Sequence, residues 1–281
     1  MKLLGSRVAL LAVAACAAEH DAINPADEVG ALDALFDGDR AGPLGVWTDV
    51  GLGVAYQHVN TGSGVLIAYG GYSARLEHSA AWATALVDAR LGAAGVGHIY
   101  AVQGPADPAY AAREIANTRL RAHVLTITSD DAPLYIVAHS SGSFVAHELL
   151  AQEYATGDSA LLWRTAYANL DGGGAGLTAN IVANLGATSF VYARDPTLAS
   201  GLSQNHGSMI ENAARFAADA TLFEVVVPNT GCASGAGWCL HDVVITSRPH
   251  DPNSFDIARD YTNFEDRTVT TSYLEPLILG T

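Results

Sequence analysis

The sequence is poor in basic residues and has almost no lysine. Lys2 is its only lysine, and 14 basic residues stand against 29 acidic ones in a chain of 281, giving a formal charge of −15. Such an acidic surface repels phosphate backbones, so we expect no nucleic-acid partner. We interpret the acidity itself as a contribution to solubility. At 49% hydrophobic composition the chain can bury one sizeable core, which is compatible with a single domain.

Cysteine is also scarce, with three in the chain. Cys232 and Cys239 bracket a glycine-rich loop, and in an oxidising compartment such a pair predicts a disulfide. A zinc site would need two further ligands, and no residues have suitable spacing. No His-Glu-x-x-His pattern occurs either. We therefore expect neither a metal nor an organic cofactor.

The N-terminal residues predict export. Lys2 and Arg7 accompany an apolar run that is too short to span a bilayer, and the run ends at Cys16. Residues 13–16, Val-Ala-Ala-Cys, resemble a bacterial lipobox, which would make Cys16 the lipidated N-terminus and attach the protein to a membrane. Cleavage after Ala17, followed by secretion, is the alternative. We expect residues 1–16 to be the export signal of an envelope lipoprotein or secreted protein.

The remainder divides into an acidic tether at 17–44 and one domain at 45–281. In the domain, apolar strand-like runs alternate with helical patterns. Strands are expected at the following ranges: one or two within 46–59, then 64–69, 98–103, 134–138, 165–170, 188–193 and 222–227. Helices are expected at 79–91, at 110–126, after the strand at 134–138 as far as about 154, at 177–185 and from about 209 to 218. This alternation predicts an α/β fold with a doubly wound, mostly parallel sheet.

The most informative segment is 134–150, Leu-Tyr-Ile-Val-Ala-His-Ser-Ser-Gly-Ser-Phe-Val-Ala-His-Glu-Leu-Leu. An apolar run meets a tight turn with Ser140 at its apex, and a helix-forming run follows. Ala138 and Gly142 complete the pattern small-x-Ser-x-small. This layout is typical of a nucleophile elbow, in which the serine hydroxyl projects above the sheet. The alternative is an ordinary small-residue turn between a strand and a helix.

With this elbow, residues 45–275 resemble the α/β-hydrolase superfamily. The resemblance implies a serine nucleophile, an acid and a histidine, in that order along the chain. It also implies that lids are usually inserted after the strand at 165–170. Here only residues 172–187 separate that strand from the next, so we expect no large lid or cap domain.

The resemblance assigns roles to particular residues. His241 follows the last strand and is the expected base. Asp195, which ends the strand at 188–193, is the favoured acid. Asp171, which ends the preceding strand, is the alternative, and the aspartate without this role would cap a turn.

The resemblance also implies an oxyanion hole. The backbone N–H of Ser141 is one expected donor, and Gly71 or Tyr72 supplies the other. The string Gly-Tyr-Ser-Ala-Arg at 71–75 is similar to the oxyanion loop of cutinase-like polyester hydrolases.

Together these features predict an exported serine hydrolase that cleaves small-molecule or polymeric carboxylic esters through an acyl-enzyme intermediate. An acyltransferase with the same triad is an alternative within the same chemistry. A noncatalytic envelope-associated protein on the same fold is the alternative from a different class, and a peptidase ranks below both.

Overall fold

A computed structural model describes residues 47–72, 74–87, 95–105, 110–157 and 160–245. The predicted export signal with Cys16 and the tether at 17–44 lie outside the described residues. The strands are β1 (Thr48–Asp49), β2 (Val54–His58), β3 (Gly64–Tyr69), β4 (Val96–Val102), β5 (Leu134–His139), β6 (Thr165–Leu170), β7 (Ala187–Arg194) and β8 (Thr221–Val226). The helices are α2 (Leu76–Leu86), α3 (Tyr110–Ile127), α4 (Gly142–Ala155), α5 (Ala160–Trp163), α6 (Ala179–Ala183), α7 (His206–Arg215) and α8 (Gly237–Asp242).

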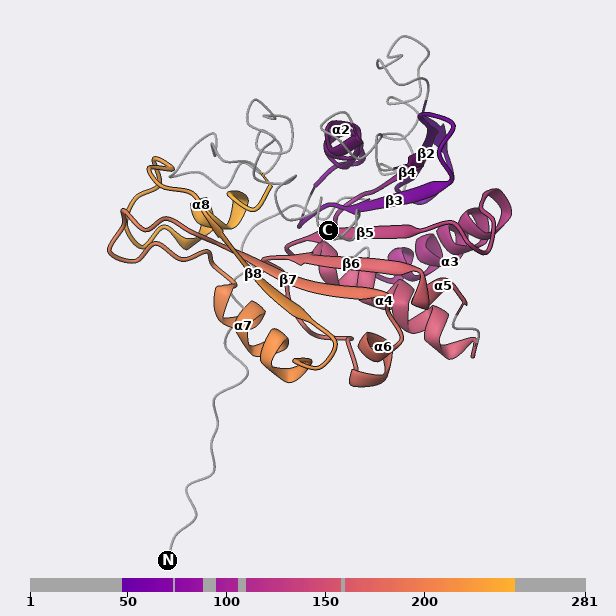
Figure 1. The fold of residues 1–281 in the computed structure, drawn as a ribbon. Helices are drawn as coiled ribbons and strands as arrows, with labels where there is room; N and C mark the ends of the chain where they lie inside the picture. The colour runs from indigo at the N-terminus through magenta and orange to yellow at the C-terminus, as the bar shows by residue number, and fades with distance from the viewer. Residues whose placement is uncertain (1–46, 73, 88–94, 106–109, 158–159, 246–281) are drawn as a thin grey trace, which may run out of the picture.

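The strands form one eight-stranded sheet in the order β1-β2-β4-β3-β5-β6-β7-β8 (Figure 1). β2 pairs antiparallel with both β1 and β4, and every other pairing is parallel. The predicted doubly wound, mostly parallel sheet is therefore confirmed. Its order, with the elbow following a central strand, is of the α/β-hydrolase type.

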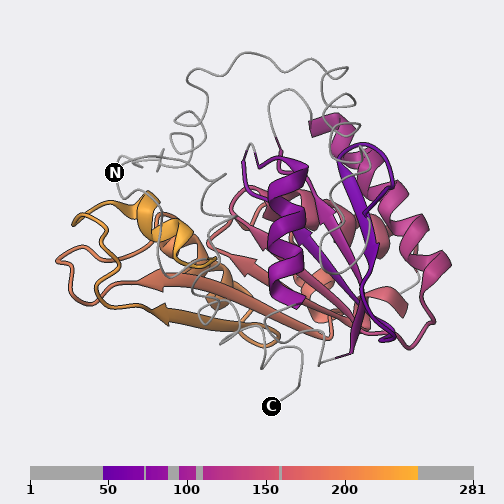
Figure 2. The ribbon, with the colours of Figure 1, turned by 90° about the horizontal axis from the view of Figure 1, so that it is seen from above.

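Helices cover both faces of the sheet. α2 and α8 lie over one face, and α3 to α7 lie over the other (Figures 1 and 2). The side chains of β5 show how one strand packs against the helices on both faces of the sheet. Leu134 and Ile136 pack with α4, whereas Tyr135 and Val137 pack in the cluster that contains α2 and α8. Alternate residues of a strand point to opposite faces, so a strand buried on both sides is apolar throughout.

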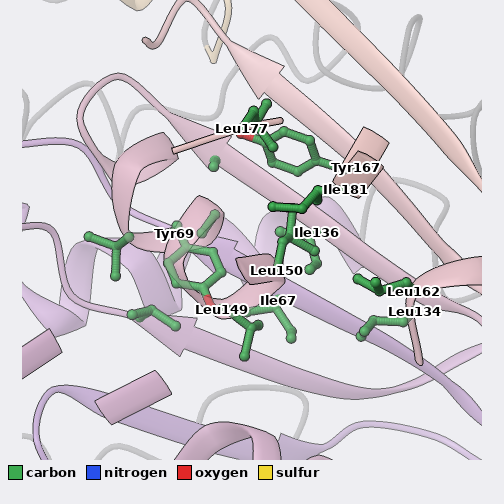
Figure 3. Close-up of a cluster of buried hydrophobic side chains, with 14 of the residues drawn as sticks. Ile67, Tyr69, Leu134, Ile136, Leu149, Leu150, Leu162, Tyr167, Leu177 and Ile181 are labelled. Carbon is green, nitrogen blue, oxygen red and sulfur yellow. The ribbon is translucent and has the colours of Figure 1, made fainter. Parts of the chain in front are cut away.

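The larger core cluster lies beneath the elbow. Figure 3 shows Ile67 and Tyr69 of β3 and Ile136 of β5 close to Leu149 and Leu150 of α4. All five are at most 2% exposed. Burying one such aliphatic side chain contributes about 1.5–3 kcal/mol. This packing fixes α4, and with it the turn from which α4 starts.

Three local features differ from expectation or bear on the site. α5 was not predicted, because a four-residue helix is shorter than a detectable hydrophobic period. His241 lies in the short helix α8 and not in a plain loop. Between β6 and β7 the chain forms only α6, so no lid is inserted there.

Among the described residues, no helix combines the length and apolarity needed to cross a bilayer.

Candidate active site

Ser140 occupies a strained turn between β5 and α4. Its φ of +54° is in the left-handed region, which non-glycine residues rarely adopt. Its N–H donates to the Leu170 carbonyl at 3.0 Å, and its own carbonyl accepts from the Ser143 N–H at 3.1 Å. These bonds hold the turn against the end of β6. The strand, the turn and the helix predicted for a nucleophile elbow are thus all present.

Gly142 allows the elbow to approach the loop after β3. A Cβ at this position would lie 2.3 Å from the Gly70 carbonyl oxygen, which is too close for any side chain. Because Tyr69 of β3 pairs with Ala138 of β5, the residues after both strands meet at the same edge of the sheet. Gly71, which is buried, and Tyr72, which is half-buried, therefore lie on the loop beside the Ser141 turn. The residues predicted as oxyanion donors thus lie in two neighbouring turns, and their role stays a prediction.

Asp171 directly follows β6 and is fully buried. Its φ is +46°, the second strained position at this edge of the sheet. The Asp171 N–H donates to the Val191 carbonyl at 2.8 Å, which anchors the residue to β7. A carboxylate is thereby held in the interior within one strand spacing of the elbow, since Leu170 pairs with His139.

His241 contacts this carboxylate. Its Nδ1 lies 2.6 Å from Asp171 Oδ2, across 70 positions of sequence, and both side chains are fully buried. With Nδ1–H donating to the carboxylate, Nε2 of the neutral ring is an acceptor. Nε2 has no hydrogen-bond partner among the described residues. A buried imidazole with one nitrogen oriented by a carboxylate and the other unoccupied is arranged to take up a proton.

The favoured acid, Asp195, does not contact His241, and that prediction is corrected here. The Asp195 carboxylate instead accepts hydrogen bonds from Thr197 N–H and Oγ1–H, Asn229 N–H, and Thr230 N–H and Oγ1–H, at 2.6–3.3 Å. The physical reason is that the His241 ring reaches the carboxylate of Asp171, whereas both oxygens of Asp195 are already taken by donors from its own turn and from the loop after β8. Asp195 ties the turn after β7 to the loop after β8.

His139 links the elbow to α8. Its ring centroid lies 4.5 Å from that of His241, and its Nε2 lies 3.3 Å from the His241 carbonyl oxygen. Burial, and next the adjacent His241, lower the pKa of His139 well below its usual value, so the ring is neutral at pH 7. His241 is therefore packed directly against the residue that precedes Ser140.

Two further features surround His241. Trp238 packs edge-on against its ring at 5.3 Å and is 40% exposed, whereas Trp82 is fully buried and belongs to the core. Cys232 and Cys239 form the predicted disulfide, with Cα atoms 5.8 Å apart, two residues before His241. The bridge restrains the chain segment from which His241 projects.

One group in the described residues has metal-ligand spacing. Side-chain ligand atoms of His139, His241 and Asp242 lie within 4.8 Å of one another, all buried. In the present arrangement His139 Nε2 is engaged with a backbone carbonyl, and His241 Nδ1 with Asp171. One nitrogen of each ring is therefore engaged in a hydrogen bond, and both rings belong to a hydrogen-bonded network.

Two residues that hold Asp171 carry no recognisable signal in the sequence. The Ser203 hydroxyl donates to Oδ1 at 2.7 Å, and the Asn205 N–H donates to Oδ2 at 3.2 Å. Both residues lie in the connection between β7 and α7, where serine and asparagine are commonplace. No local pattern distinguishes them from ordinary turn residues.

The sequence matches none of the protein-family models and none of the curated proteins compared with it. Similar solved structures include TT1662 from Thermus thermophilus, with 15% identity, TM-score 0.46, and coverage of 82% of this chain and 94% of that chain. A dienelactone hydrolase-like promiscuous phosphotriesterase from metagenomic libraries shows 14% identity and a TM-score of 0.42, and the match covers 75% of this chain and 89% of that chain. A predicted CIB-like hydrolase from Thermoplasma acidophilum shows 12% identity and a TM-score of 0.42, and the match covers 78% of this chain and 95% of that chain. Similarities of this size carry no argument about activity.

Proposed function

We propose that the protein is a serine hydrolase of carboxylic esters in which Ser140, His241 and Asp171 form the catalytic triad. The observation that supports this most is the 2.6 Å contact between His241 and Asp171, placed beside a strained elbow that presents Ser140. A buried histidine oriented by a carboxylate, next to an elbow serine, is the arrangement that activates a hydroxyl for acyl transfer.

The reaction follows from these roles. Ser140 Oγ attacks the ester carbonyl while His241 Nε2 takes the hydroxyl proton. The tetrahedral oxyanion is stabilised by the N–H of Ser141 and that of Gly71 or Tyr72. Collapse expels the alcohol, which receives the proton from His241, and leaves an acyl group on Ser140. Water then attacks this acyl-enzyme with His241 as base again, releasing the acid. Asp171 stays ionised throughout and stabilises the imidazolium.

The decisive experiment is labelling of the purified full chain with a fluorophosphonate probe, which forms a bond to an activated serine oxygen and expels fluoride. We expect a single labelled site at Ser140 that disappears in Ser140→Ala. Ser189→Ala is the matched control, because Ser189 is 1% exposed and its hydroxyl has no hydrogen-bond partner in the described structure. A folded protein that does not label would contradict the proposal.

The acid is tested in the same way. Asp171→Ala removes the partner of His241, and we expect a loss of about 10³–10⁴-fold in the acylation rate. Asp195→Ala leaves that partner in place, so the folded fraction of this variant retains a rate within about tenfold of the parent. If Asp195→Ala abolished acylation while Asp171→Ala did not, the assignment of the acid would be wrong.

We also propose that the protein is exported and carries lipid on Cys16. The predicted signal supports this, as does the disulfide, which is typical of proteins that fold in an oxidising compartment. Mass spectrometry of the protein exported from a bacterial host distinguishes the alternatives: a diacylated Cys16 supports the lipoprotein, and an unmodified N-terminus beyond Ala17 supports plain secretion. Cys16→Ser is the control.

A further inference from the structure

Ser203 contacts the acid from the side opposite His241. It lies between β7 and α7, is 1% exposed, and its hydroxyl donates to Asp171 Oδ1 at 2.7 Å. His241 occupies the other oxygen, Oδ2, at 2.6 Å. The two carboxylate oxygens therefore have different partners, one a serine hydroxyl and the other the histidine.

The direction of the Ser203 hydroxyl is set by the backbone. The Ala193 N–H donates to Ser203 Oγ at 3.2 Å, and the Ser203 N–H donates to the Ala193 carbonyl at 2.9 Å. A hydroxyl has one proton to donate and lone pairs to accept with. Because Ala193 approaches the acceptor side, the proton is left to point at Asp171. The adjacent bridge between Arg194 and Leu202 holds this segment along β7.

Asn205 completes the support of the acid. Its N–H donates to Asp171 Oδ2 at 3.2 Å, and its side-chain amide donates to the Asp171 carbonyl at 2.7 Å. The carboxylate thus accepts hydrogen bonds from three directions, and none of these contacts is with Lys or Arg. Without the Ser203 donor, Oδ1 would be a buried oxygen with no hydrogen bond from the part of the chain that the structure describes, and the carboxylate would be free to turn away from Nδ1.

We propose that Ser203 is a positioning residue for the triad. It locks the rotation of the Asp171 carboxylate so that Oδ2 faces His241 Nδ1, and it withdraws charge from that carboxylate. No proton is transferred to or from Ser203 in the reaction. The inference rests on the proposed serine-hydrolase function, and it adds a fourth side chain, from the β7–α7 connection, to the machinery that sets the basicity of His241.

The test is steady-state and burst kinetics of the full chain on a p-nitrophenyl ester, over pH 5–9, for Ser203→Ala against Ser189→Ala. Both substitutions remove one buried serine hydroxyl near the same strand, and only the first removes a hydrogen bond. Since a hydrogen bond to a charged group is strong, we expect kcat to fall by about 10–100-fold in Ser203→Ala with KM unchanged.

The pH profile separates positioning from mere support of the fold. Loss of the donor leaves more negative charge on Oδ2, which stabilises the His241 imidazolium, so the acid limb of kcat/KM should move to higher pH in Ser203→Ala. Ser203→Thr keeps a hydroxyl and should recover part of the rate and the original limb. Thermal unfolding of each variant verifies that folded protein is being compared.

The outcomes are distinct. A slower Ser203→Ala with a shifted limb and recovery in Ser203→Thr supports the proposal. Kinetics equal to those of Ser189→Ala, or a slower rate with an unshifted limb and no recovery, overturns it while leaving the triad intact. Failure of the unsubstituted protein to label at Ser140, or a normal rate in Asp171→Ala, overturns the serine-hydrolase function itself and so is recognised separately.

Discussion

Asp195 is expected to be a major determinant of stability although it does not contact His241. Its carboxylate is 1% exposed and accepts five hydrogen bonds from Thr197, Asn229 and Thr230. Burial alone would raise the pKa of Asp195, but the bonds from Thr197 and Thr230 outweigh it and hold the pKa well below its usual value. The charged form is therefore the one that the fold stabilises.

The magnitude follows from the number and setting of these donors. A hydrogen bond to a charged group contributes about 1.5–3 kcal/mol, but five bonds to one carboxylate are not additive because they share an acceptor. Thr197 and Asn229 are exposed, so in Asp195→Ala water can replace some of the hydrogen bonds that these residues make to the carboxylate. We expect Asp195→Ala to lower the free energy of unfolding by about 3 kcal/mol at pH 7.

The pH dependence has a definite sign. In the unfolded chain Asp titrates near pH ~3.9, and in the folded protein Asp195 titrates below that value. Between these values the unfolded state binds more protons, so the contribution of Asp195 is complete above about pH 4 and is lost as the pH falls. Urea unfolding followed by tryptophan fluorescence, at pH 7 and at pH 3.5, should show a smaller difference between the parent and Asp195→Ala at the lower pH.

Asp219→Ala is the control, because Asp219 is an exposed aspartate that lies just before β8. We expect this variant to differ from the parent by less than about 0.5 kcal/mol. The reasoning is refuted if Asp195→Ala is no less stable than Asp219→Ala at pH 7, or if its deficit persists unchanged in acid.

Two further predictions concern His147 and the disulfide. Burial lowers the pKa of His147 to about 4, and the neutral ring contacts Tyr167 Oη and the Ala175 carbonyl, both at 2.7 Å. Because the unfolded value is about 6.5, the stability that neutral His147 contributes is complete above pH 6.5 and declines towards pH 4. Between pH 7 and pH 5 the free energy of unfolding should therefore fall by about 2 kcal/mol less in His147→Gln than in the parent. Urea titrations that show the same decrease in both proteins would contradict this. Replacing Cys232 and Cys239 by serine should cost about 2–3 kcal/mol in thermal unfolding. It should also slow fluorophosphonate labelling, since the bridge restrains His241; an unaltered labelling rate at a temperature where the variant is folded would exclude that restraint.

The sheet and the elbow could be predicted because their signals are local. The apolar runs of β3 and β5 are buried on both faces, and such runs are visible as continuous hydrophobic segments. Ser140 has its strand before it and its helix after it, so the context needed to recognise the elbow lies within residues 134–150.

The aspartate that contacts His241 could not be chosen from sequence because the choice depends on a distance between remote segments. Asp171 and Asp195 both end a parallel strand, and both precede turn-forming residues. What distinguishes them is that His241 of α8, 70 positions further along the chain, contacts the carboxylate of Asp171 and not that of Asp195. Ser203 was missed for the same reason, since its role exists only once β7 and β6 are side by side.

The order in which the chain is synthesised has a consequence for when the site of His241 and Ser140 can form. Ser140 stands at the midpoint of the sequence, whereas His241, which packs against His139 across 102 positions, is synthesised much later. Non-local pairings of this kind form only after the intervening chain is available. A nascent or truncated chain that ends before α8 therefore contains Ser140 but lacks His241. If the proposed function is right, such chains cannot hydrolyse esters in the compartment of synthesis, and activity begins only when the last helix has docked.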